Sequence, residues 1–149
     1  FLTCNAITLS DDVQIVIRFF GDSATIHENY DFVHATNYWE SNTKKITTNN
    51  KALECILGRD LRYIGSKYPV ASLFRTRKFI KRGWNITAGQ ILKIVMQLQS
   101  LNLHDFSTLE EQLIGVDVAY FTEILEKMKS ESPDKVDDAY LAKLIDEMF

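Results

Sequence analysis

The chain has 149 residues, of which 46% are hydrophobic and 25% are charged, so its size and composition predict one soluble globular domain with a core of its own. It contains neither an apolar run long enough to span a bilayer nor a signal-peptide pattern, which argues against a membrane or secreted protein and predicts a cytoplasmic one. Two cysteines are too few for a disulfide framework, and three scattered histidines have no metal-ligand spacing.

The first part of the chain predicts short strands joined by one short helix. Residues 6–20 alternate apolar and polar side chains around a Ser-Asp-Asp turn, which is typical of a β-hairpin. A helix is expected over residues 24–29, with Asp22 or Ser23 as its N-terminal cap. Residues 32–39 predict a third strand, which should pair with the hairpin in one small sheet covered by the helix.

Three more short elements complete this part. A strand around residues 45–47 should follow a turn and lie beside the third strand. A helix is predicted over residues 50–57, and Gly58 should end it in the left-handed conformation that glycine adopts at little cost. Residues 61–64 predict a last short strand.

The remainder of the chain predicts helices. Pro69 suits the first turn of a helix that continues to Arg82, and Gly83 should end it. Thr87 should cap the next helix, and Ser107 opens a sequence with the capping-box spacing. Two further amphipathic helices are predicted over residues 117–129 and 136–149.

These elements together predict an α+β fold, in which a small mixed or antiparallel sheet with short helices is followed by an all-α half. The α/β part spans residues 1–64 and the helical part spans residues 65–149. Neither a repeat, a low-complexity tract nor a long linker separates the two parts in the sequence, and we expect them to pack as one unit.

Charge is unevenly distributed along the chain. The net charge is −3, but residues 59–82 hold eight basic side chains and one acidic side chain, a net charge of +7 within a remainder of −10. The basic residues of this segment are Arg59, Arg62, Lys67, Arg75, Arg77, Lys78, Lys81 and Arg82. A local excess of this size predicts either an anionic partner or neutralisation by the acidic C-terminal helices.

The helix predicted over residues 69–82 places Arg77 close to the middle of its apolar stripe. On a helical wheel the stripe consists of Val70, Leu73, Phe74 and Ile80. Arg75 and Arg82 lie off it. A guanidinium that faces a core must be paired or must point into a polar cleft, because burying an unpaired charge is very costly. Arg77 is therefore predicted either to form a salt bridge within the chain or to face an anionic ligand.

The same segment also has the composition of a nucleic-acid-binding face. Phosphate groups would track along its cations while nearby aromatic rings stack on bases. The candidate cations are Arg59, Arg62, Arg75, Lys78, Lys81 and Arg82. The candidate rings are Tyr63, Tyr68 and Trp84.

Motifs that carry chemistry by themselves are absent from the sequence. It has no Walker loop, no dinucleotide-binding glycine pattern, no nucleophile elbow and no Cys-His signature. The adjacent acids at 11–12 and 137–138 have the positions of a turn and a helix start, where solvated or capping roles are common. We therefore predict neither catalytic nor metal-binding residues, no tight binding of Mg²⁺ and no cofactor in this chain.

Three segments of the chain, 29–38 (NYDFVHATNY), 58–65 (GRDLRYIG) and 74–86 (FRTRKFIKRGWNI), carry a remote family resemblance. The first is similar to a strand reading R-R-D-F-T-x-N-A-x-x-Y. The second is similar to a D-L helix end followed by an L-R-x-x-G strand, and the third to a helix reading L-R-A-x-R-F-x-x-x-x-G-F-x-I. In this order the chain resembles the head and neck of the class II nucleotidyltransferases, which are the CCA-adding enzymes and bacterial poly(A) polymerases.

The resemblance implies that this chain is the C-terminal part of a nucleotidyltransferase-like protein. Asp31 would then orient the triphosphate, and Arg75 or Arg77 would pair with phosphate oxygens. Trp84 would pack the neck. The family's metal-binding D-x-D motif is absent and would precede Phe1, which is not a methionine. The chain alone is therefore expected to be inactive, and Mg²⁺ would act only with a missing N-terminal part.

Several positions depart from the family pattern. Asn29 and Tyr30 stand where the family has paired arginines, and Ala35 replaces its asparagine.

The chain as a whole also resembles bacteriophage-type proteins. A second hypothesis is therefore a non-enzymatic phage-type module that binds nucleic acid or an acidic protein through the basic face of residues 59–82, and a third is an assembly subunit whose charges are all structural. RNA, DNA or a nucleotide are thus candidate partners, a membrane is not, and the oligomeric state stays open.

Overall fold

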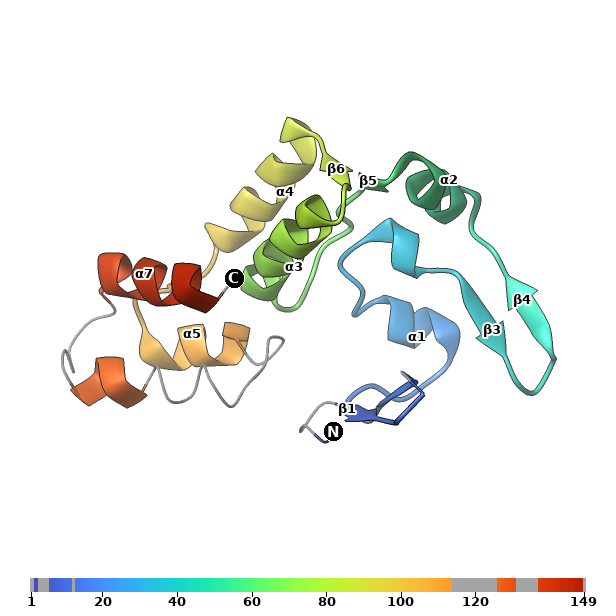
Figure 1. The fold of residues 1–149 in the computed structure, drawn as a ribbon, viewed down its shortest axis with the longest axis horizontal. Helices are drawn as coiled ribbons and strands as arrows, with labels where there is room; N and C mark the ends of the chain where they lie inside the picture. The colour runs from blue at the N-terminus through green and yellow to red at the C-terminus, as the bar shows by residue number, and fades with distance from the viewer. Residues whose placement is uncertain (1, 3–5, 12, 114–125, 131–136, 149) are drawn as a thin grey trace.

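The computed structural model describes residues 2, 6–11, 13–113, 126–130 and 137–148, which form an α+β fold (Figure 1). The predicted fold class is confirmed. In chain order the elements are β1 (Ala6–Thr8), β2 (Gln14–Val16), α1 (Ser23–His27), η1 (Val33–Ala35), β3 (Tyr38–Glu40), β4 (Lys45–Thr47), α2 (Asn50–Gly58), β5 (Asp60–Leu61), α3 (Pro69–Lys81), β6 (Asn85–Ile86), α4 (Ala88–Leu98), α5 (Phe106–Leu113) and α7 (Asp138–Met148). Residues 126–130 are helical as well. Among the described residues, no helix is long and apolar enough to cross a membrane.

The strands form three separate two-stranded sheets in the described part of the chain. β1 pairs with β2 and β3 pairs with β4, both antiparallel, whereas β5 and β6 are parallel. The hairpin predicted over residues 6–20 and the strand predicted around residues 45–47 are therefore confirmed, although β2 is shorter than expected. The prediction of a single sheet that joins the hairpin to residues 32–39 is wrong.

Residues 32–39 do not form one continuous strand. Phe32 forms an isolated antiparallel bridge with Tyr63, and the chain then turns through the short 3-10 helix η1 before β3 begins. A backbone hydrogen bond of 3.0 Å from Val33 N to Arg62 O fixes this pairing. Burial of the Phe32 ring against Tyr63 therefore has a larger effect than the local strand pattern. As a result, Phe32 pairs with a residue that is distant in the sequence.

Local signals place several helix ends correctly. Asp22 caps α1, and its carboxylate accepts a backbone hydrogen bond from the first turn at 2.9 Å. Pro69 begins α3, and Gly83 follows its end with φ +80°. α4 begins directly after Thr87, as predicted, although the Thr87 side chain forms no capping hydrogen bond. α7 lies within the helix predicted over residues 136–149. Residues 117–125 of the other predicted C-terminal helix lie outside the described residues.

The end of α2 differs from the prediction. Arg59, not Gly58, has the left-handed conformation, with φ 53°. Gly58 remains helical, and its missing side chain leaves space, because a Cβ there would lie 2.9 Å from Oδ2 of Asp60. Glycine thus permits close packing at this position, while Arg59 adopts a conformation that costs about 1–2 kcal/mol for a residue with a side chain.

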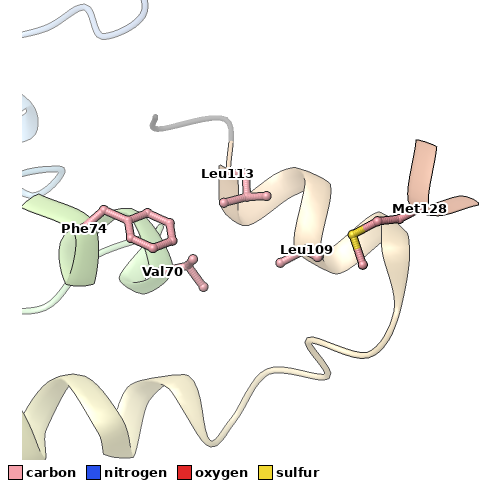
Figure 2. Close-up of a cluster of buried hydrophobic side chains, with 5 residues drawn as sticks. All are labelled: Val70, Phe74, Leu109, Leu113 and Met128. Carbon is pink, nitrogen blue, oxygen red and sulfur yellow. The ribbon is translucent and has the colours of Figure 1, made fainter. Parts of the chain in front are cut away.

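Two clusters of buried side chains form the core of the described residues. One consists of Val70, Phe74, Leu109, Leu113 and Met128, so it joins α3 to α5 and to the helical residues 126–130 (Figure 2). The other consists of Phe32, Leu61, Tyr63 and Ile94. Because Phe79 of α3 packs against this second cluster, α3 connects the elements before it with α5 and α7, as its central place in Figure 1 shows.

Asp105, rather than Ser107, caps the N-terminus of α5. Its carboxylate accepts hydrogen bonds from Thr108 N at 2.8 Å and from the Ser107 hydroxyl at 2.5 Å. The Ser107 side chain and the neighbouring backbone donors hold the pKa of Asp105 below its usual value. The capping-box prediction is wrong because Ser107 donates to the aspartate instead of accepting from the helix.

Removal of this cap should lower the melting temperature of the chain. Asp105→Ala deletes the acceptor of the first turn, whereas Asp105→Asn keeps one and should have the smaller effect. Since folding lowers the pKa of Asp105, its stabilisation is present at neutral pH and is lost as the pH falls through the folded-state value, which lies below 3.8. Thermal unfolding followed by circular dichroism tests this. The exposed change Glu111→Ala in the same helix is the control, and equal melting of the two alanine variants would contradict the prediction.

Candidate binding surface at helix α3

A charged pair joins α3 to the segment before η1. Nη1 of Arg75 lies 2.5 Å from Oδ2 of Asp31. The Asp31 side chain is 12% exposed and the Arg75 side chain is 39% exposed, so the carboxylate is the more buried partner. From the sequence, both residues are candidate phosphate ligands. In the structure they instead form an ion pair with each other. The pair therefore holds two segments in place that are 44 residues apart.

Arg77 lies on the exposed side of α3, so the prediction that it faces the core is wrong. Its neighbours in the predicted apolar stripe, Leu73 and Ile80, are 44% and 50% exposed. Of that stripe only Val70 and Phe74 are buried. The covered side of the helix continues through small and polar residues, which are Ala71, Ser72 and Thr76. Small side chains let neighbouring segments approach closely, and a pattern of hydrophobicity alone does not reveal this.

Acidic residues of the last helices contact side chains outside residues 59–82. Oε2 of Glu110 in α5 lies 3.4 Å from Nζ of Lys129, and Oδ1 of Asp138 in α7 lies 3.4 Å from Nδ1 of His104. Both contacts are exposed to solvent, so they contribute little to stability. These two acids do not neutralise the basic segment.

Three arginines of the basic segment, Arg59, Arg77 and Arg82, form no ion pair with any residue that the structure describes. Arg62 differs, because its Nη1 lies 3.2 Å from Oε2 of Glu54. Arg82 follows α3 directly, and a Cβ on Gly83 would lie 3.3 Å from Nη1 of Arg59. Arg59 and Arg82 thus lie with Lys78 and Lys81 of the last turn at the C-terminal end of α3, where the helix dipole favours positive charge, and Arg77 directly precedes this turn.

The aromatic residues near these cations are largely covered. Tyr63 and Tyr68 are buried, and the Tyr63 hydroxyl donates to Oε1 of Gln97 at 2.5 Å. Burial raises the pKa of Tyr63. The Arg18 guanidinium lies 4.6 Å from the centre of the Tyr68 ring. The prediction that these rings stack on bases is wrong for both tyrosines, because their faces contact the protein itself.

His34 belongs to an aromatic cluster that sequence reasoning misses. Its ring centre lies 4.6 Å from that of Trp84, 4.7 Å from that of Phe79 and 5.9 Å from that of Phe32. The buried Nδ1 of His34 has no hydrogen-bond partner among the described residues. Trp84 and Phe79 come from a distant part of the chain, so only the neighbouring Phe32 hints at this cluster in the sequence.

Burial lowers the pKa of His34 below its usual 6.5, and the nearby Asp31 carboxylate opposes this shift only in part. The folded chain therefore disfavours the protonated ring. Protonation of His34 does not affect the stability of the chain above the unfolded pKa, and it lowers that stability as the pH drops through 6.5. His34→Phe should reduce the loss of stability between about pH 7.5 and pH 5.5. Urea unfolding of both chains at the two pH values measures the difference. An unchanged pH dependence in the variant would contradict this expectation.

Two comparisons with known proteins find sequences similar to this chain. The family model described as "Gabija anti-defense 2 family protein" matches residues 1–59. The chain is similar to Gabija anti-defense 2. That protein, from Bacillus phage SPbetaL7, is 23% identical over 135 residues, which are 86% of this chain and 34% of the relative. The chain thus spans about a third of the length of that relative. No solved structure matches it.

These matches correct the family assignment made from the sequence. The family model and the curated relative that match are both described as Gabija anti-defense 2 and not as a class II nucleotidyltransferase, so that assignment is wrong, and with it the first functional hypothesis. The resemblance to phage-type proteins agrees with the matches. The second hypothesis, a phage-type module with a basic binding face, fits them better.

The described residues contain no group of three or more His, Cys, Asp and Glu side chains that could hold a metal ion. Asp22 and Asp105 serve as helix caps, and Asp31 is the partner of a single cation. The outer side of α3 exposes the Arg77 guanidinium beside the aliphatic side chains of Leu73 and Ile80. A guanidinium group can bind a carboxylate or a phosphate through two hydrogen bonds.

Proposed function

We propose that this chain is part of a phage protein that acts against the Gabija defence system, and that it contributes by binding a component of that system. The similarity to Gabija anti-defense 2, which covers 86% of the chain, carries this proposal. The role requires no cofactor, and it would place the chain in the cytoplasm of the infected cell.

The basic segment of residues 59–82 is the part of the chain that we propose for this contact. Its net charge of +7 favours an acidic partner. The guanidinium groups of Arg59, Arg77 and Arg82 support the proposal, because they have no ion pair within the described residues and retain their capacity to bind carboxylates.

A protein partner is favoured over nucleic acid. Binding of a single strand by this segment would use aromatic rings on which bases stack. Tyr63 and Tyr68 are buried and offer no open face, and Trp84 is half-buried against His34 and Phe79. We therefore propose an acidic protein surface as the partner.

Binding and plating experiments test this function. The purified chain should bind one purified component of the Gabija system in calorimetry. Its expression in cells that carry Gabija should raise the plating efficiency of a phage that Gabija restricts. The same phage on cells without Gabija is the control and should plate equally with and without the chain. A chain that binds no component and leaves plating unchanged would overturn the proposal.

A further inference from the structure

We propose that the outer side of α3 is a docking stripe for an acidic protein surface, in which carboxylates lie beside apolar side chains. The stripe consists of Leu73, Arg77 and Ile80. This inference rests on the proposed function and adds the surface and the chemistry of the partner.

The three residues share one side of the helix. Their spacing of four and three positions places them above one another on an α-helix. All three are exposed, and the aliphatic pair flanks the guanidinium on both sides along the helix. Ala71, which lies opposite the stripe, has no exposed surface, and neither does Ser72. One aliphatic and cationic stripe of α3 thus remains uncovered by the described residues.

The stability of α3 does not explain why an arginine occupies position 77. The last turn of α3 contains Lys78 and Lys81, whose charges lie where the helix dipole favours them. Arg77 precedes that turn, and it forms no ion pair with any described residue. A long cation in the middle of an aliphatic stripe interrupts any packing of that stripe on an ordinary core. Arg77 is instead placed to bind a carboxylate on the surface of a partner protein.

The composition of the stripe favours protein over a phosphate backbone. Arginine is enriched at protein interfaces, where its stem packs on apolar groups while its planar head binds a carboxylate through two hydrogen bonds. Leu73 and Ile80 would gain little from contact with a sugar-phosphate backbone, whereas they would bury apolar surface against a protein. The basic charge of residues 59–82 would attract the same acidic surface from a distance.

Two substitutions on the stripe test the inference. Arg77→Glu reverses the charge and should weaken binding to the recognised Gabija component by about tenfold or more, since it sets two like charges against each other. Ile80→Ser keeps the charge and removes apolar area, and it should weaken binding by about threefold to tenfold. Lys93→Glu, the same charge reversal at an exposed position of α4, is the control and should bind within about twofold of the unchanged chain. Calorimetry measures the affinity, and thermal unfolding checks that each variant is folded.

Each outcome decides between the two proposals. If the unchanged chain binds the component and both stripe variants bind it equally well, the docking stripe is overturned and the proposed function stands. If the unchanged chain binds no component, the proposed function fails and the stripe fails with it. A duplex DNA probe is titrated in parallel. DNA binding that Arg77→Glu abolishes, without binding of any protein component, would assign the stripe to nucleic acid and overturn the inference.

Discussion

Replacement of Phe32 by alanine should lower the free energy of unfolding by about 3–5 kcal/mol, which is the effect of removing a large side chain from a well-packed core. Phe32 is 1% exposed. Its ring lies 5.8 Å from that of Tyr63 and 6.0 Å from that of Phe79, measured between centres. The residue thus connects the segment before η1 with β5 and α3, and its loss leaves a cavity between all three.

Phe20→Ala is a matched control, because Phe20 is the same residue at 78% exposure. Its substitution should change the free energy of unfolding by no more than about 0.5 kcal/mol. Urea denaturation of both variants and of the unchanged chain gives the two differences. A Phe32→Ala chain as stable as Phe20→Ala would show that the described cluster around Phe32 contributes nothing to folding.

Features that depend on neighbouring residues are well predicted from the sequence. Asp22 as the cap of α1, and Pro69 and Gly83 as the ends of α3, are correct because each acts through its own backbone or through a bond across three residues. The hairpin of β1 and β2 is correct for the same reason, since a short turn joins its strands.

Features that depend on distant residues are not predicted. Phe32 has strand character, and no local signal indicates that its partner is Tyr63, 31 residues later. The parallel pairing of β5 with β6 is equally remote, because α3 lies between the two strands. The exposed state of Ile80 shows the same limit, since a helical wheel ranks side chains by hydrophobicity but does not reveal which side has a neighbour.

The candidate surface was predictable in part. The excess of positive charge in residues 59–82 is a property of composition, and the exposed Arg59, Arg77 and Arg82 lie within it. Which arginine turns inward was not predictable, because both Arg75 and Arg77 are long enough to reach either solvent or a partner. The ion pair with Asp31 turns Arg75 inward, and the position of Asp31 next to α3 depends on the bridge between Phe32 and Tyr63.

Arg75→Ala should therefore destabilise the chain, by about 1–3 kcal/mol, because it leaves the Asp31 carboxylate without its cation. This range is smaller than that of a fully buried pair, since the Arg75 side chain is 39% exposed and solvent screens the charges. Arg77→Ala removes the same group from the exposed side of α3 and should change the stability by no more than about 0.5 kcal/mol.

A double-mutant cycle separates the pair from the loss of packing by the Arg75 stem. Asp31→Asn removes the charge and keeps the shape, so Arg75→Ala should cost much less in the Asp31→Asn chain than in the unchanged chain. The four free energies of unfolding, measured in urea at low salt, give the coupling energy, which should be about 1 kcal/mol or more. Additive effects of the two changes would mean that Arg75 stabilises α3 through its aliphatic stem alone, and that the Asp31 carboxylate does not depend on it.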